Sequence, residues 1–290
     1  MLTRISFIVV FLLACSVHAQ VTLTDDLGRA VELSTPPQHI VSLAPSITET
    51  LFAIGAGDQV AGVTDYCNYP EETKVKARVG GVINPSIETV VGVEPDLIIL
   101  SMEGNMREDF ARLTSLNVPV FVTNPRNMTG IYKSITDLGA LTRHKDEADE
   151  LVASMQLRER RITAPAHARV TPKVLMIVAL QPLIVVGSKT FLAELLEMAG
   201  GGNIAASSPA TYPTYSRESV VVENPDVLIV MSDAMRDPDE LLSMFPEWAT
   251  INAVRNNRVA RINSDIVSRP GPRAIDALEL LDKIIHEGHE

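Results

Sequence analysis

The chain has 290 residues, of which 46% are hydrophobic and 21% are charged, a composition typical of a soluble protein with sizeable apolar cores. Its length allows one large domain or two domains of ordinary size. The formal net charge of −11 argues against partners such as nucleic acid and anionic membranes.

Residues 1–19 have the features of a cleaved signal peptide. A positive residue precedes the apolar stretch Ile5 to Ala14, which is too short to anchor the chain across a membrane. Val17-His18-Ala19 fits the small-x-small cleavage pattern, so we expect a soluble mature protein in the periplasm. A competing pattern around Cys15 is that of a lipoprotein acylated at this residue.

Strands and helices alternate along the first half of the mature chain. Val21 to Leu33 alternates apolar and polar residues around a turn, which predicts a β-hairpin. His39 to Leu43 predicts a strand, and Ser46 is expected to cap the helix that follows it. The remaining pattern predicts strands at 60–63 and 118–122 and helices at 105–116 and 128–141.

One long helix is predicted in the middle of the chain. Residues 145–162 carry apolar residues at helical spacing among many charges, and neither Gly nor Pro interrupts them. Beyond this helix the alternation resumes, with strands at 173–179 and 258–262 and helices at 190–199, 237–244 and 272–286.

This order predicts an α/β protein with mainly parallel sheets. We expect two Rossmann-like lobes, at 20–144 and 165–290, with a ligand cleft between them. The linking helix is placed at 145–164 and should limit closure of the lobes to a small hinge motion.

One segment occurs twice in the chain. Residues 86–101 and 216–231 share a Ser, a Glu, two Val and a Pro-Asp pair at matching positions without a gap. Each copy predicts a short Ser-capped helix, a break at the Pro, and a strand buried on both faces. The repeat places Glu88 and Glu218 in the first helical turn of each lobe, where a carboxylate contributes about 0.3–1 kcal/mol to helix stability.

Several motifs together resemble a known family. They are Asp-Asp-Leu-Gly-Arg at 25–29, the segment 40–55, the two repeat segments, Gly-Gly-Asn-Ile at 201–204, the segment 212–218 and Ser-Arg-Pro-Gly-Pro-Arg at 268–273. Their order and spacing resemble the helical-backbone class of periplasmic substrate-binding proteins, which serve ABC importers of cobalamin, ferric siderophores and haem. The resemblance covers nearly the whole mature chain, and its cobalamin-binding members are the most similar.

The resemblance implies a monomeric binding protein whose partners are a small-molecule ligand and an ABC importer permease with its cytoplasmic ATPase. It implies that Glu88 and Glu218 dock on arginines of the permease. It also implies no cofactor, with cobalamin or a related corrinoid as the bound ligand. The ligand-binding residues implied by the resemblance or by their place in the expected cleft are Pro45, Ser46, Tyr66, Val82, Met102, Tyr212, Asp265, Ile266, Val267, Ser268 and Arg269.

The chain departs from the cobalamin-binding pattern in its aromatic residues. Val82 and Met102 stand where those proteins have tryptophans, and Trp248 is expected to pack in a core. A ferric siderophore or haem is therefore kept as an alternative ligand. Haem would need an axial ligand, which Tyr66 or Tyr69 could supply as a phenolate. An anionic siderophore could be bound by Arg217, Arg269 or Arg273, although for Arg273 a structural ion pair is an equal alternative.

Other classes of function find little support in the sequence. The histidines are scattered and have no carboxylate cluster around them, so no metal site is expected. An exported α/β enzyme is the alternative of another class, but the chain has neither a Gly-x-Gly-x-x-Gly nor a Gly-x-Ser-x-Gly motif. Asp96 and Asp226 follow Pro at helix–strand junctions, which indicates turn chemistry. We therefore expect no catalytic residues.

Overall fold

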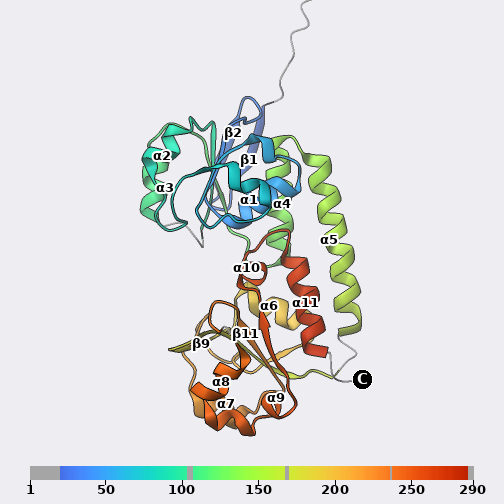
Figure 1. Cartoon of the computed structure of the whole chain (residues 1–290). Helices are drawn as coiled ribbons and strands as arrows, with labels where there is room; N and C mark the ends of the chain where they lie inside the picture. Colours follow the sequence, from blue (N-terminus) through green and yellow to red (C-terminus); the bar gives the residue numbers. More distant parts are fainter. Residues whose placement is uncertain (1–19, 103–106, 167–169, 236, 287–290) are drawn as a thin grey trace, which may run out of the picture.

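The computed structural model describes residues 20–102, 107–166, 170–235 and 237–286. The predictions for the signal peptide and for Cys15 fall outside these residues. The chain folds into two α/β lobes with the long helix α5 (Lys145–Ala166) beside them (Figure 1). Within the described ranges, no helix combines the length and the apolar character needed to cross a membrane.

The amino-terminal lobe is built on a parallel sheet of five strands in the order β5-β4-β3-β6-β7. The strands are β3 (Ile40–Ser42), β4 (Val60–Val63), β5 (Ala77–Arg78), β6 (Leu97–Ser101) and β7 (Val120–Thr123). The helices are α1 (Pro45–Ala53), α2 (Ile87–Gly92), α3 (Arg107–Thr114) and α4 (Met128–Thr142), with the 3-10 turns η1 (Gly57–Gln59) and η2 (Glu71–Val75). The predicted hairpin is confirmed as the antiparallel pair β1 (Val21–Thr24) and β2 (Ala30–Leu33).

The carboxy-terminal lobe has parallel strands in the order β10-β8-β11-β12, and β9 pairs antiparallel with β8. The strands are β8 (Lys173–Leu180), β9 (Leu183–Val185), β10 (Gly202–Asn203), β11 (Val227–Met231) and β12 (Val259–Ile262). The helices are α6 (Phe191–Met198), α7 (Arg217–Glu223), α8 (Pro238–Met244), α9 (Asn252–Arg255), α10 (Ser264–Val267) and α11 (Ala274–His286), with the 3-10 turn η3 (Pro246–Thr250). The predicted α/β fold with mainly parallel sheets is confirmed.

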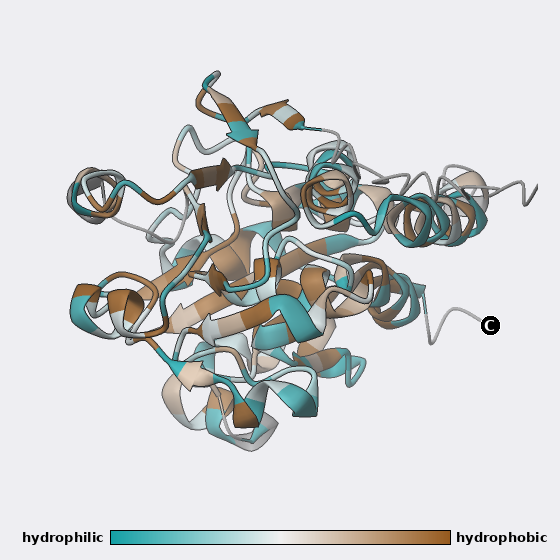
Figure 2. Cartoon of the chain, turned by 90° about the horizontal axis from the view of Figure 1, so that it is seen from above, coloured by the Kyte–Doolittle hydropathy of each residue, from teal (hydrophilic) through white to brown (hydrophobic). Residues whose placement is uncertain are grey.

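The central strands are apolar because helices cover both faces of each sheet. In β6, Leu97 and Ile99 belong to the core beneath α1 and α4, whereas Ile98 and Leu100 pack with residues of α2 and α3. Seen from above, the hydrophobic colouring follows the strands and the inward sides of the helices (Figure 2). Trp248 is fully buried and stacks on Phe245 with ring centroids 4.2 Å apart, which confirms its expected role in a core.

One hydrophobic core runs from the first lobe into the second. It includes Leu51 of α1, Met155 and Ile162 of α5, and Leu278 of α11. A helix that packs in the same core as both lobes opposes their separation, because opening would expose apolar side chains to water.

The repeated segments make equivalent hydrogen bonds in the two lobes. Ser86 accepts a hydrogen bond from the Thr89 amide at the start of α2, and Ser216 accepts one from the Ser219 amide at the start of α7. Asp96 and Asp226 then each bind the backbone amide at the start of a neighbouring strand. The predicted caps and turn aspartates are confirmed, so the two segments repeat in structure as well as in sequence.

The predicted cap of α1 is wrong. The helix begins at Pro45, Ala44 holds the cap position, and no side chain caps it. Proline is well suited to the first helical position, because its missing N–H would find no partner there anyway. The helix therefore starts one residue earlier, and Ser46 is a buried residue of its first turn.

Candidate functional site

A cleft of about 540 Å³ lies between the lobes. The amino-terminal lobe contributes residues at the carboxyl ends of its strands and in the loops beyond them, and the carboxy-terminal lobe contributes the loop before α7 and the segment after α10. The carboxyl ends of parallel strands are the usual place for ligands in such folds. The lining residues are Ala44, Pro45, Ser46, Val82, Ser101, Arg126, Tyr212, Ser268, Arg269 and Pro270.

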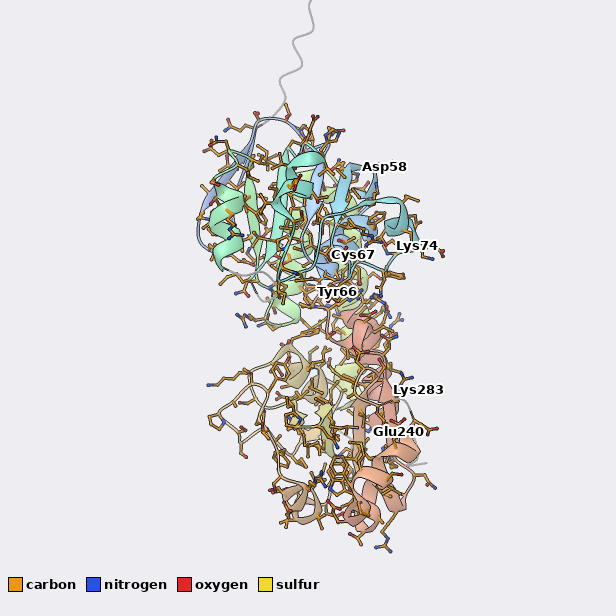
Figure 3. All side chains as sticks on the ribbon, turned by 60° about the vertical axis from the view of Figure 1, so that its left-hand side comes forward. Asp58, Tyr66, Cys67, Lys74, Glu240 and Lys283 are labelled. Atoms are coloured by element: carbon orange, nitrogen blue, oxygen red, sulfur yellow. The ribbon has the colours of Figure 1, made fainter. Side chains whose placement is uncertain are left out.

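Six of the predicted ligand-binding residues therefore meet in one cavity, namely Pro45, Ser46, Val82, Tyr212, Ser268 and Arg269. Tyr66 and Met102 are 63% and 42% exposed but are not among the lining residues. Tyr66 lies at the edge of its lobe that faces the other lobe (Figure 3). Met102 directly follows Ser101, which lines the cleft.

The segment around α10 divides into an exposed and a buried side. The Asp265 side chain is 45% exposed, whereas Ile266 packs against the core and Val267 is fully buried in it. Val267 offers no surface to a ligand, which corrects the prediction for this residue. The reason is helical geometry, since consecutive residues of a helical turn cannot all point to the same side.

A buried ion-pair network joins the lobes beside the cleft. Glu49 of α1 is 2% exposed and binds Arg269 at 2.9 Å and Arg273 at 2.6 Å. Burial lowers the pKa of Arg273, but the hydrogen bond and charge of Glu49 outweigh it and the net shift is upward. Gly271, between the two arginines, approaches Ser46 so closely that a Cβ atom would lie 3.2 Å from its carbonyl oxygen. The first turn of α1 is thus fastened to the opposite lobe.

Arg269 is saturated by groups of the protein itself. Besides Glu49 it donates hydrogen bonds to the Asn68 side chain, the Tyr66 carbonyl and Asp265. Asn68 in turn donates to Asp265 at 2.7 Å. The sequence suggested Arg269 as an anion-binding residue, but its charge is already compensated by two carboxylates. Arg273 is the structural ion pair that was the alternative, and its guanidinium also lies 4.3 Å from the Tyr69 ring centroid.

Arg217, which the sequence suggested as an anion-binding residue, and the described histidines lie in other surroundings. Arg217 stacks on Phe245 and donates to the Met244 carbonyl, away from the cleft lining. His39, His144 and His286 each hydrogen-bond to a backbone carbonyl. No group of three potential metal ligands occurs among the residues that could be searched, which are those the structure describes.

Sequence reasoning missed two cationic residues near the cleft. Arg126 follows β7 by a short loop and lines the cleft, and Lys189 precedes α6 and lines a smaller adjoining pocket. Arg126 could have been found from its place just beyond a predicted strand. The sequence carries no comparable signal for Lys189.

The repeated glutamates are exposed in both lobes. Each lies in the first turn of its helix, α2 or α7, and that helix leads into a parallel strand, β6 or β11. Glu88 and Glu218 therefore occupy equivalent positions in the two lobes, on helices drawn toward the outer ends of the lobes (Figure 1).

Comparison with known families decides the classification. A family profile described as periplasmic binding protein matches residues 40–266. The chain belongs to this family. A vitamin B12-binding protein of Vibrio parahaemolyticus is 30% identical over 84% of this chain and 87% of its own length. An uncharacterized ABC transporter substrate-binding lipoprotein of Bacillus subtilis is 32% identical over 92% of this chain and 85% of its own length.

Solved structures of the family have the same fold. The periplasmic vitamin B12 binding protein of Vibrio cholerae is 26% identical, with a TM-score of 0.76 over 86% of this chain and 97% of that one. A periplasmic heme-binding protein of Roseiflexus is 25% identical, with a TM-score of 0.80 over 88% of this chain and 100% of that one. These relatives are named as binding and transport proteins, and the fold is common to binders of different ligands.

Proposed function

We propose that this protein captures cobalamin or a related corrinoid in the cleft between its lobes and delivers it to an ABC import permease. The observation that carries the proposal is the cleft itself, in which residues of both lobes that were predicted to bind the ligand meet. The 30% identity to a protein named for vitamin B12 binding supports the same ligand.

The chemistry of the cleft suits a broad ring with polar edges. Val82, Pro45 and Pro270 give apolar walls, and the half-exposed Tyr212 gives an aromatic one. Ser46, Ser101 and Ser268 supply hydroxyl groups that can hydrogen-bond to the amide side chains of a corrinoid. The volume of about 540 Å³ falls within the range of roughly 300–1,000 Å³ that is common for small-molecule sites.

Haem or a ferric siderophore is the alternative ligand for the same transport role. The exposed Tyr66 favours haem, since a tyrosine phenolate is an axial ligand of haem iron. The likeness to a heme-binding protein points in the same direction.

Delivery would depend on Glu88 and Glu218. Both are exposed, one on each lobe, so arginines of a permease could bind them at the same time. In this scheme the cytoplasmic ATPase drives import, and the monomer is exported to the periplasm through residues 1–19. The lobes would be residues 20–144 and 165–290, with 145–164 as the stiff connection that permits only a small closure.

Calorimetric titration of the mature protein, starting at Gln20, tests the proposal. Cyanocobalamin, haem and several ferric siderophores would be titrated in turn. One-to-one binding of cyanocobalamin with an affinity in the nanomolar range would support the corrinoid reading. Binding of haem or a siderophore instead would keep the transport role and replace the ligand, and binding of none would overturn the proposal.

A further inference from the structure

A smaller pocket of about 110 Å³ adjoins the cleft and shares Arg126, Tyr212, Ser268 and Pro270 with it. We call it the side pocket. Its other lining residues are Lys189, Thr190, Phe191, Leu192 and Thr211. Because the two cavities share these residues, a ligand that fills the cleft could extend one of its arms into the side pocket.

The charge of these walls is opposite to that of the protein as a whole. The chain has 36 acidic and 25 basic residues, yet the described residues that line the cleft and the side pocket include Arg126, Lys189 and Arg269 and no carboxylate. The charge of Arg269 is compensated by its ion pairs with Glu49 and Asp265. Lys189 of the carboxy-terminal lobe therefore offers its charge to the side pocket, and Arg126 of the other lobe lies in the same wall.

Lys189 is held in position by its backbone. Its φ of 59° lies in the left-handed region, which is uncommon for a residue other than glycine and is often found at functional sites. The preceding turn is fixed, because the Gly187 amide donates to Thr211 and a Cβ atom at Gly187 would lie 2.3 Å from the Ala210 carbonyl oxygen. Within the described part of the chain, Lys189 has no ion-pair partner of its own.

We infer that the side pocket is an anion subsite that binds a carboxylate or phosphate group on an arm of the cleft ligand. Lys189 acts as a point charge, and Arg126 adds a second cationic side chain to the same wall. The Thr211 hydroxyl adds a neutral donor. This inference rests on the proposed function for the identity of the arm. The phosphate of a corrinoid nucleotide and a carboxylate of haem or of a siderophore share the required chemistry.

The first experiment compares ligands with and without the anionic group. Cyanocobalamin is paired with dicyanocobinamide, which lacks the phosphate, and haem with its dimethyl ester. Lys189→Gln should weaken binding of the anionic member about tenfold or more and change binding of the other member little, because only the charged contact is lost. Lys189→Arg should restore most of the affinity. Lys74→Gln makes the same change of charge on the outer surface of the first lobe (Figure 3) and should have no effect.

The pair that shows this difference identifies the source of the anion. An equal loss for both members of a pair, or no loss in Lys189→Gln, would overturn the inference even though the ligand binds. If the wild-type protein binds no ligand of either pair, the proposed function fails, and the subsite is then tested separately.

The separate test uses inorganic phosphate and ¹⁵N NMR on the mature protein. Addition of phosphate should shift the amide signals of Lys189, Thr190, Thr211 and Ser268, and Lys189→Gln should abolish the shifts. High concentrations of NaCl should also suppress them, because salt screens the interaction. Absence of shifts at these residues, or equal shifts in Lys189→Gln, would overturn the subsite whatever the ligand of the cleft is.

Discussion

Glu49 and Arg273 form a two-point ion pair between the lobes. The Arg273 Nε atom donates to Glu49 Oε2 at 2.8 Å, and its Nη2 atom donates to Oε1 at 2.6 Å. The Glu49 side chain is 2% exposed, and Arg269 shares its Oε1 atom. One carboxylate thus holds two arginines of the opposite lobe next to the cleft.

Removing this carboxylate should destabilise the protein strongly. In Glu49→Ala, two largely buried guanidinium groups lose their common partner, which should lower the free energy of unfolding by about 3–5 kcal/mol. Urea denaturation measures the change. The exposed pair of Glu71 and Lys74 provides the control, and Glu71→Ala should cost about 0–1 kcal/mol. Similar losses in the two variants would mean that the interlobe network contributes no more than a surface pair.

The glutamates of the repeat should be needed for uptake and not for ligand binding. Combining Glu88→Ala with Glu218→Ala should leave ligand affinity within about twofold and abolish transport, because the expected loss is in the contact with permease arginines. Calorimetry and uptake into cells or proteoliposomes measure the two properties. Glu72→Ala with Glu247→Ala removes one exposed glutamate from each lobe elsewhere and should transport normally. Reduced ligand affinity with intact permease binding would contradict the docking role.

The contact between α4 and α5 should depend on Gly139. A Cβ atom there would lie 2.4 Å from the Ala148 Cβ and 3.0 Å from the His144 carbonyl oxygen. Gly139→Ala should therefore destabilise the protein by about 1–3 kcal/mol through overpacking. Gly92, also helical, has no atom within 4 Å of an added Cβ, so Gly92→Ala should be neutral or slightly stabilising. Thermal unfolding of both variants tests this, and equal melting temperatures would contradict it.

Glu194 should make stability depend on pH. Burial raises its pKa above the usual 4.5 and nearby Glu159 and Glu197 raise it further, although the hydrogen bond from the Met128 amide opposes the rise. A raised pKa means that the folded state holds the proton more tightly than the unfolded state. The stabilisation from the protonated group is present at low pH and is lost as pH rises above 4.5 through the folded-state pKa.

Glu194→Gln should remove the loss of stability that the wild type suffers as the pH rises. The amide oxygen can still accept the Met128 hydrogen bond, so the variant should be more stable than the wild type at pH 7 and equal to it near pH 4. Urea denaturation at several pH values measures the difference. The matched change Glu197→Gln on the same helix should give a smaller effect, and a pH-independent difference for Glu194→Gln would contradict the pKa shift.

The sequence by itself determined the local structure and the family. Continuous apolar runs such as Leu97–Ser101 require burial on both faces, and a Ser before a helix, as at Ser86 and Ser216, satisfies a free backbone amide. These relationships involve neighbouring residues, so the alternation of strands and helices and the repeat were predictable. The same holds for six of the residues that line the cleft, because they follow strands or fall in recognisable motifs.

Only the tertiary structure decided how charges are shared across the cleft. Glu49 and Arg273 are 224 positions apart, and nothing in the pattern around either residue selects the other. Their pairing depends on how the two lobes pack against each other. The same packing brings Arg126 and Lys189 into the lining of one pocket. The burial of Val267 was likewise decided by the direction in which a short helix faces the core. Pattern and capping act over a few residues, whereas desolvation and ion pairing depend on distance in space, which only the folded chain defines.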